Sequence, residues 1–183
     1  MTDRLLNNRL RLLAYGGLGM ALVAVGTIVI HIPMPGTEGY VNVGDTFIFL
    51  IAATFGPLLG LIAGGFGSAL ADLILGYPHW APFTLVIKGL EGLLVGWLLS
   101  RTGQTTTSRP GIVTVLVYIL GAVWMVLGYT VVEIFIYGWG AALGSIPGNS
   151  LQGGVSVVLG WLLTVAVRRV LPASWFDSRY SRA

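Results

Sequence analysis

The sequence contains no cysteine and a single lysine, and charged residues make up only 9% of its 183 positions. The lack of cysteine excludes disulfide bonds, thiolate metal ligands and a cysteine nucleophile. The two histidines, His31 and His79, are too few and too far apart to indicate a zinc site. A soluble domain carries about 25% charged residues. The chain is also 55% hydrophobic, so we expect most of its surface to face lipid.

Motifs for ATP hydrolysis and for common hydrolases are absent as well. The sequence has no Gly-x-x-x-x-Gly-Lys-Ser/Thr loop, no Gly-x-Ser-x-Gly elbow and no His-Glu-x-x-His pair. We therefore expect neither an enzyme nor a metal or cofactor site in this chain. The net charge of +3 comes from arginines at the ends of apolar segments, which indicates membrane topology rather than nucleic-acid binding.

Apolar segments of membrane-spanning length dominate the chain. A bilayer core requires about 20 mostly apolar residues per helix. The sequence predicts an all-α integral membrane protein, a six-transmembrane-helix bundle that forms a single domain over residues 1–183. A break at Gly64 and Gly65 separates the second helix from a short third one. The expected helices cover residues 12–32, 46–64, 66–76, 83–100, 111–137 and 150–171.

The arginines predict the orientation of this bundle. Lys and Arg mark cytoplasmic loops, and with six spans all nine arginines fall on one side. The opposite loops, residues 33–45, 77–82 and 138–149, contain no Lys or Arg. We therefore expect both the N and the C terminus in the cytoplasm, with residues 172–183 as a cytoplasmic tail. The nine are Arg4, Arg9, Arg11, Arg101, Arg109, Arg168, Arg169, Arg179 and Arg182.

The three outer loops are rich in prolines, aromatic residues and amides. Prolines stiffen a loop, while aromatic rings and amides can stack on a ligand and hydrogen-bond it. An interfacial aromatic belt accounts for Tyr77, Trp80 and Trp139 about as well as a binding site does. It accounts less well for Asn42 and Asn149.

Four ionisable residues lie inside the predicted spans: Asp72, Lys88, Glu91 and Glu133. Each costs about 2.5–3.5 kcal/mol at a helix centre, and such residues usually face the bundle interior and mark a functional path. At a rise of about 1.5 Å per residue, Asp72, Lys88 and Glu133 share one layer about 6–8 Å below the outer loops. Glu91 lies one turn deeper on the face of Lys88.

Two of the charged residues also have purely structural interpretations. Lys88 can pair with Asp72 or Glu91 and merely neutralise it. Asp45 precedes Thr46 and is well placed as the N-cap of the second helix.

Glu133 has no evident local partner, which favours a role in binding a ligand. The next helix begins near Asn149 and Gln152, which places two amides at the same level. A pocket of carboxylates, amides and aromatic rings that opens to the outside suits a small polar heterocycle.

Small residues recur at helical spacing on three helices and predict close packing in lipid. Gly56, Gly60 and Gly64 form one such face, and a second consists of Gly89, Gly92 and Gly96. Most such faces serve the interior of the bundle. The first helix is the best candidate for docking another membrane subunit, because its other faces are large and apolar. Its stripe consists of Ala14, Gly17, Ala21 and Ala24.

Four stretches make the sequence similar to a known family. They are GYVNVGDTFIFL at 39–50, GPLLGLIAGG at 56–65 continuing to SALAD at 68–72, PFTLVIKGLEGLLVG at 82–96, and NSLQGG at 149–154. Together with the six-helix layout, they resemble the substrate-binding S components of energy-coupling factor (ECF) vitamin transporters. The likeness is to the riboflavin and hydroxymethylpyrimidine branch.

This resemblance implies a partner assembly and a cellular location. The chain would bind a vitamin or precursor at its outer face, in the plasma membrane of a bacterium, as a multi-pass protein. It would associate with a transmembrane coupling subunit and two cytoplasmic ATPases, which use the ATP. The docking pattern Ala-x-x-x-Ala of the family stands here as Gly17-x-x-x-Ala21.

The resemblance also implies a set of ligand-binding residues. Four would contact the substrate directly, and the others would complete the pocket or cover it. Hydroxymethylpyrimidine and vitamin B6 forms such as pyridoxine are the expected substrates, whereas riboflavin would require a larger cavity. The direct contacts would be Lys88, Glu133, Asn149 and Gln152, and the others Tyr40, Asn42, His79, Trp80 and Tyr137.

Three competing interpretations remain open. A self-sufficient secondary transporter could use Asp72, Glu91 and Glu133 as a proton path. An intramembrane enzyme would need a nucleophile and base, or a metal constellation, and the sequence offers neither. A purely structural membrane subunit would leave the outer cluster of aromatic residues and amides unexplained.

Overall fold

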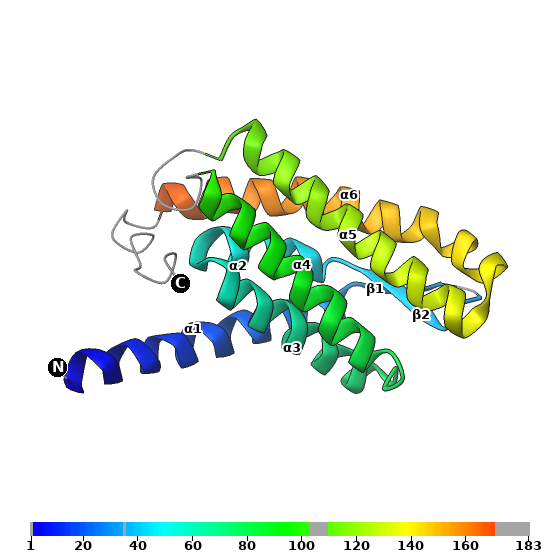
Figure 1. The fold of residues 1–183 in the computed structure, drawn as a ribbon, viewed down its shortest axis with the longest axis horizontal. Helices are drawn as coiled ribbons and strands as arrows, with labels where there is room; N and C mark the ends of the chain where they lie inside the picture. The colour runs from blue at the N-terminus through cyan, green and yellow to red at the C-terminus, as the bar shows by residue number, and fades with distance from the viewer. Residues whose placement is uncertain (1, 35, 103–109, 171–183) are drawn as a thin grey trace.

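The structure, a computed structural model, describes residues 2–34, 36–102 and 110–170. The cytoplasmic tail predicted at 172–183 lies outside these residues. The described part contains six helices and one two-stranded hairpin (Figure 1). In chain order these are α1 (Thr2–Val29), β1 (His31–Met34), β2 (Gly39–Asn42), α2 (Gly44–Phe55), α3 (Pro57–Leu75), α4 (Ala81–Arg101), α5 (Ile112–Tyr137) and α6 (Trp139–Val170).

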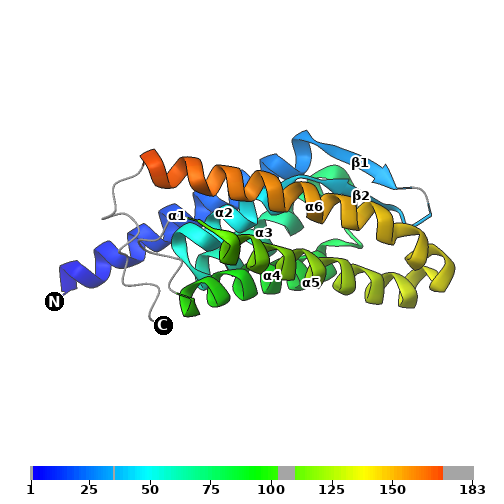
Figure 2. The ribbon, with the colours of Figure 1, turned by 90° about the horizontal axis from the view of Figure 1, so that it is seen from above.

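Five of these helices are long and apolar enough to cross a membrane, and the prediction of a helical membrane protein is confirmed. The start of α1 and the end of α6 lie at the same end of the bundle (Figures 1 and 2). The hairpin and the turn between α5 and α6 lie at the opposite end. This arrangement agrees with the two groups of loops expected from the arginines. The cytoplasmic position of the termini stays a prediction.

The short helix is the second one, not the third as predicted. Gly56 interrupts the chain with a φ of +88°, a backbone conformation that suits glycine, and Pro57 then occupies the first turn of α3. Gly64 and Gly65 continue α3 without a break. A Cβ added to Gly65 would lie only 2.8 Å from the carbonyl oxygen of Leu85. These two glycines therefore allow α3 and α4 to approach closely, and the predicted break there is wrong.

α2, with 12 residues, is too short to cross a bilayer core on its own, so five of the six predicted transmembrane helices have spanning length. α2 packs against α1, α3, α4 and α6, and most of its side chains are buried. Phe49 on α2 stacks on Tyr118 of α5 with 4.7 Å between ring centroids. Val95, Leu99 and Val117 complete this part of the core. α2 is thus an internal element around which the longer helices are arranged.

The hairpin was not predicted. α1 ends at Val29 rather than at residue 32, and His31 to Met34 pairs antiparallel with Gly39 to Asn42. Pro33 disfavours helical backbone at the residue before it, which helps to explain why the helix ends here. The first loop is therefore an ordered two-stranded element whose second strand contacts α1 and α6.

The third outer loop was also predicted incorrectly, because most of it is helical. α6 begins at Trp139, immediately after Gly138, whose φ is +83°. Pro147 lies inside this helix. Membrane helices tolerate proline where neighbouring groups satisfy the freed backbone. Because α6 begins at Trp139, one continuous helix carries Ser145, Asn149 and Gln152, in its half near the hairpin.

Candidate functional site

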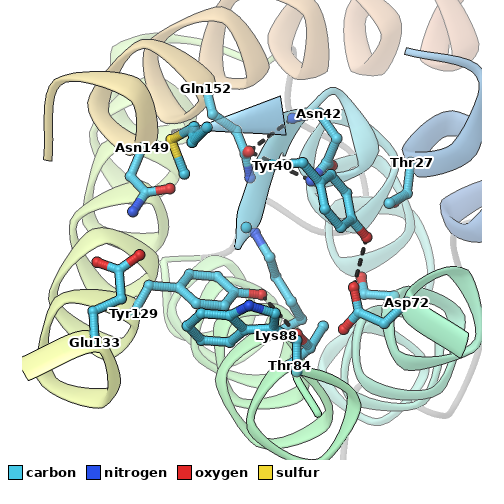
Figure 3. A pocket seen from close by; sticks show the side chains of 14 residues that line it. Thr27, Tyr40, Asn42, Asp72, Thr84, Lys88, Tyr129, Glu133, Asn149 and Gln152 are labelled. Carbon is cyan, nitrogen blue, oxygen red and sulfur yellow. Dashed lines mark hydrogen bonds between the residues drawn. The ribbon is translucent and has the colours of Figure 1, made fainter. Parts of the chain in front are cut away.

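A cavity lies between the hairpin and the adjacent halves of the long helices (Figure 3). It encloses about 450 Å³ of space not occupied by atoms, part of it open to solvent. The cavity volume that compares with those of known small-molecule sites is only about 30 Å³, well below their range of about 300–1,000 Å³, so side chains must move to admit a vitamin-sized ligand. The lining residues are Thr27, Met34, Gly39, Tyr40, Asn42, Ser68, Asp72, Trp80, Thr84, Lys88, Tyr129, Glu133, Asn149 and Gln152.

Three aromatic side chains line the cavity: Tyr40 of β2, Trp80 immediately before α4, and Tyr129 of α5. The rings of Trp80 and Tyr129 meet edge to face, with centroids 5.8 Å apart. The indole Nε1 of Trp80 donates to the carbonyl oxygen of Glu38 at 3.1 Å, which ties the hairpin turn to the start of α4. The hydroxyls of Thr84 and Tyr129 lie 3.1 Å apart and share a hydrogen bond. The cavity thus offers aromatic surface next to fixed polar groups.

One wall carries a carboxylate from α5. The Ser145 hydroxyl donates to Oε2 of Glu133, and the Asn149 amide lies 3.5 Å from the same serine oxygen. All three side chains are at least 95% buried. The expected proximity of Glu133 and Asn149 is therefore present in the structure, and Ser145 provides the local partner that the sequence did not reveal.

The opposite wall carries Asp72 from α3. The Tyr40 hydroxyl donates to Oδ1 of Asp72 at 2.6 Å. Burial raises the pKa of Tyr40, and the nearby Asp72 carboxylate raises this pKa further. The phenol therefore stays protonated and acts as a donor at physiological pH. Oδ2 of Asp72 is buried and has no hydrogen-bond partner among residues 2–34, 36–102 and 110–170.

Lys88 lines the cavity, but its ammonium group is already paired. It donates to Asp45 and lies 3.5 Å from a carboxylate oxygen of Glu91. The predicted pairing with Glu91 is confirmed, while Asp45 replaces Asp72 as the other partner. The predicted N-cap role of Asp45 is wrong: Val43 precedes the helix, and Asp45 lies in its first turn.

Gln152 connects this ion cluster to the hairpin. Its Nε2 donates to Oδ2 of Asp45 at 2.8 Å, and its Oε1 accepts from the backbone N–H of Asn42 at 2.8 Å. Both ends of the amide are thus occupied. Gln152 and Asn42 line the cavity as predicted, and their hydrogen bonds hold β2 against α6.

Seven of the nine expected ligand residues line the cavity, whereas His79 and Tyr137 do not. The Tyr137 hydroxyl lies 3.3 Å from Nε2 of His79, and its ring centroid is 6.0 Å from that of Trp80. The rings of both residues contact that of Trp80, which does line the cavity. The His79 side chain is 42% exposed.

Sequence reasoning missed several polar lining residues, among them Thr27, Ser68, Thr84 and Tyr129. Each is a single hydroxyl in an apolar helix, which is a weak signal. Of these residues, Tyr129 was the easiest to predict from the sequence, because it precedes Glu133 by four residues and therefore shares its helix face.

The small-residue stripe on α1 is only partly exposed. Ala14 and Ala21 are exposed, and a Cβ added to Gly17 would meet no atom within 4 Å. Ala24 is buried at 5% exposure, so the four residues do not form one uniform surface. The opposite face of α1 contacts the bundle, for example where Gly19 approaches Ala63. Ala14, Gly17 and Ala21 thus face away from the bundle.

Comparison with known proteins gives matches over most of the chain. The model of the family described as ECF-type riboflavin transporter, S component, matches residues 7–169. An uncharacterized protein of Pyrococcus woesei is 47% identical over 138 residues, which is 75% of this chain and 88% of that protein. The thiamine precursor transporter HmpT of Lactococcus lactis subsp. cremoris (strain MG1363) is 30% identical over 164 residues, 89% and 91% of the two chains.

A solved structure shares the fold. The S-component for biotin from an ECF-type ABC transporter superimposes with a TM-score of 0.56 and covers 94% of this chain and 98% of its own. The two sequences are 17% identical. This match supports the six-helix architecture and carries no information on the ligand.

Proposed function

Because the chain belongs to the family of S components of ECF-type transporters, we propose that it captures a small water-soluble vitamin or vitamin precursor in the cavity near the hairpin. S components are transport subunits rather than enzymes, and the protein is a multi-pass protein of the plasma membrane. The observation that carries the proposal is the cavity itself. It combines aromatic walls, two carboxylates and amides at the hairpin end of the bundle, opposite the end at which α4 and α6 carry Arg101, Arg168 and Arg169.

The substrate class that we propose is a hydroxymethylpyrimidine or a vitamin B6 form. HmpT, which is 30% identical, is described as a thiamine precursor transporter. A flat nitrogen heterocycle can contact the rings of Trp80 and Tyr129. Its amino or hydroxymethyl group can donate to Glu133, as expected for a carboxylate ligand.

We further propose that delivery depends on partners. The sequence has no ATP-hydrolysis loop, so a coupling subunit and two ATPases would supply the energy. The outward face of α1 at Ala14, Gly17 and Ala21 is suited to receive the coupling subunit, because small residues let two helices approach closely in lipid.

Calorimetric binding to the purified chain in detergent tests the capture function. The panel is hydroxymethylpyrimidine, pyridoxine, pyridoxamine, thiamine and riboflavin, with Glu133→Gln as the site variant. Glu38→Gln is a matched control, because Glu38 lies on the hairpin turn with a side chain that is 78% exposed. We expect tight binding of one small heterocycle, lost in Glu133→Gln and kept in Glu38→Gln. Equal binding by both variants would contradict the assigned site.

A further inference from the structure

Acidic and basic residues are separated between the two ends of this protein. Five of its seven acidic residues are Glu38, Asp45, Asp72, Glu91 and Glu133, and all five lie in or near the half that contains the hairpin and the cavity. The arginines of the described helices lie toward the other end, in the first part of α1 and in the last turns of α4 and α6. In the half of the bundle that contains the cavity, Lys88 is therefore the one lysine whose positive charge can balance the negative charges of these carboxylates.

That lysine does not leave a positive charge available to a ligand. Lys88 donates to Asp45 and is 3.5 Å from Glu91, and all three side chains are at least 98% buried. Gln152 adds a second donor to Asp45 at 2.8 Å. One ammonium group thus faces two carboxyl groups, and the cluster as a whole has no excess of positive charge.

Two further carboxyl groups face the cavity from opposite walls. Figure 3 shows Glu133 and Asp72 on either side of Tyr129 and Thr84. Tyr40 donates to one oxygen of Asp72, while the buried Oδ2 makes no direct hydrogen bond to a described residue and has only the Thr84 hydroxyl, which is shared with Tyr129, as a nearby donor. A buried acceptor without a full complement of donors is unfavourable, because it has lost its hydrogen bonds to water. A ligand with a hydrogen-bond donor at this position would remove that penalty.

We propose that the cavity selects its ligand by charge: it binds a flat nitrogen heterocycle, cationic or rich in N–H and O–H donors, between Glu133 and Asp72, and it rejects phosphate and carboxylate compounds. This inference rests on the proposed capture function and adds Asp72 as a second ligand-binding carboxylate. An anion in the cavity would be close to two carboxyl groups with no uncompensated cation beside it. A cation or a donor-rich base would be attracted at the same place.

Matched pairs of compounds test the charge selection on the purified full-length chain. The pairs are hydroxymethylpyrimidine with its phosphate ester, and pyridoxamine with pyridoxamine 5′-phosphate, and biotin and pantothenate serve as carboxylate vitamins. Within the pair that binds, we expect the phosphorylated compound to bind at least about 100-fold more weakly. We also expect Asp72→Asn to weaken binding by about 10- to 100-fold, the range for hydrogen bonds to charged groups.

The controls separate the ligand contact from folding. Glu38→Gln removes an exposed carboxylate and should bind like the unmodified chain. Tyr40→Phe keeps the Asp72 charge but removes its donor, so it provides a second variant if Asp72→Asn does not fold. We expect Tyr40→Phe to retain the preference for the unphosphorylated compound.

Each result has a distinct meaning. Equal affinity for a phosphorylated and an unphosphorylated partner, or tight binding of biotin or pantothenate, overturns charge selection and leaves the capture function standing. Unchanged binding in Asp72→Asn overturns the role of Asp72. If the folded protein binds no compound of either charge, both the inference and the proposed function fail.

Discussion

A methyl group added at Gly96 tests how closely α4 packs on the break between α2 and α3. A Cβ at this position would lie 2.6 Å from both N and Cα of Pro57, whereas ordinary contact begins at 3.4 Å. The neighbouring atoms are backbone, and Pro57 is held in the first turn of α3. The helices must therefore separate by a substantial fraction of an ångström to accept Gly96→Ala.

The expected magnitude follows from the packing. Forcing an extra methyl group into a tight interface costs about 1–3 kcal/mol. Alanine recovers up to about 1 kcal/mol through its higher helix propensity. We therefore expect a net destabilisation, measured as a lower unfolding temperature of the purified protein in detergent.

Gly89→Ala is the matched control on the same helix. Gly89 is also buried, but its added Cβ would lie 3.5 Å from the nearest atoms, Cα of Gly65 and O of Leu61. This change should be neutral or slightly stabilising. If both variants unfold at the same temperature, the reasoning about the α3–α4 approach is refuted.

Two other changes separate the helix surface from the buried charges. Gly17→Leu should keep the fold and ligand binding, because open space surrounds Gly17, but it should reduce co-purification with the coupling subunit. Gly154→Leu, at another open position, is the control. An equal loss of co-purification in both variants would contradict the proposed docking face on α1. Lys88→Met should lower stability by about 3–5 kcal/mol, because Asp45 and Glu91 lose their shared cation. An unchanged unfolding temperature would show that Lys88 is not a structural ion-pair partner.

The sequence was sufficient to predict two of the long helices closely, because the bilayer fixes the length of an apolar segment that crosses it. The expected spans at 83–100 and 111–137 agree closely with α4 and α5. The break at Gly64 and Gly65 was wrong because glycine has two uses in a membrane helix. It can end a helix, or it can allow another backbone to approach, and the second use applies here.

The site could be predicted in part for a related reason. Rare charged and amide residues in apolar helices indicate a cavity, and Glu133, Asn149 and Lys88 line it. The sequence did not reveal which of them are paired. The Lys88–Asp45 contact joins residues 43 positions apart. The Ser145–Glu133 contact requires Ser145 to lie within α6, whereas the sequence predicted a loop at this position.

Chemical labelling of single cysteines tests most directly whether the cavity holds the ligand, because the natural chain contains no cysteine. Met34→Cys places a thiol in the cavity wall, and Ile32→Cys places one on the same strand, where the natural side chain is 59% exposed and does not line the cavity. We predict that the compound that binds by calorimetry slows labelling at position 34, with a concentration dependence that matches its affinity, and leaves position 32 unaffected. Equal labelling at position 34 with and without this compound would contradict the account.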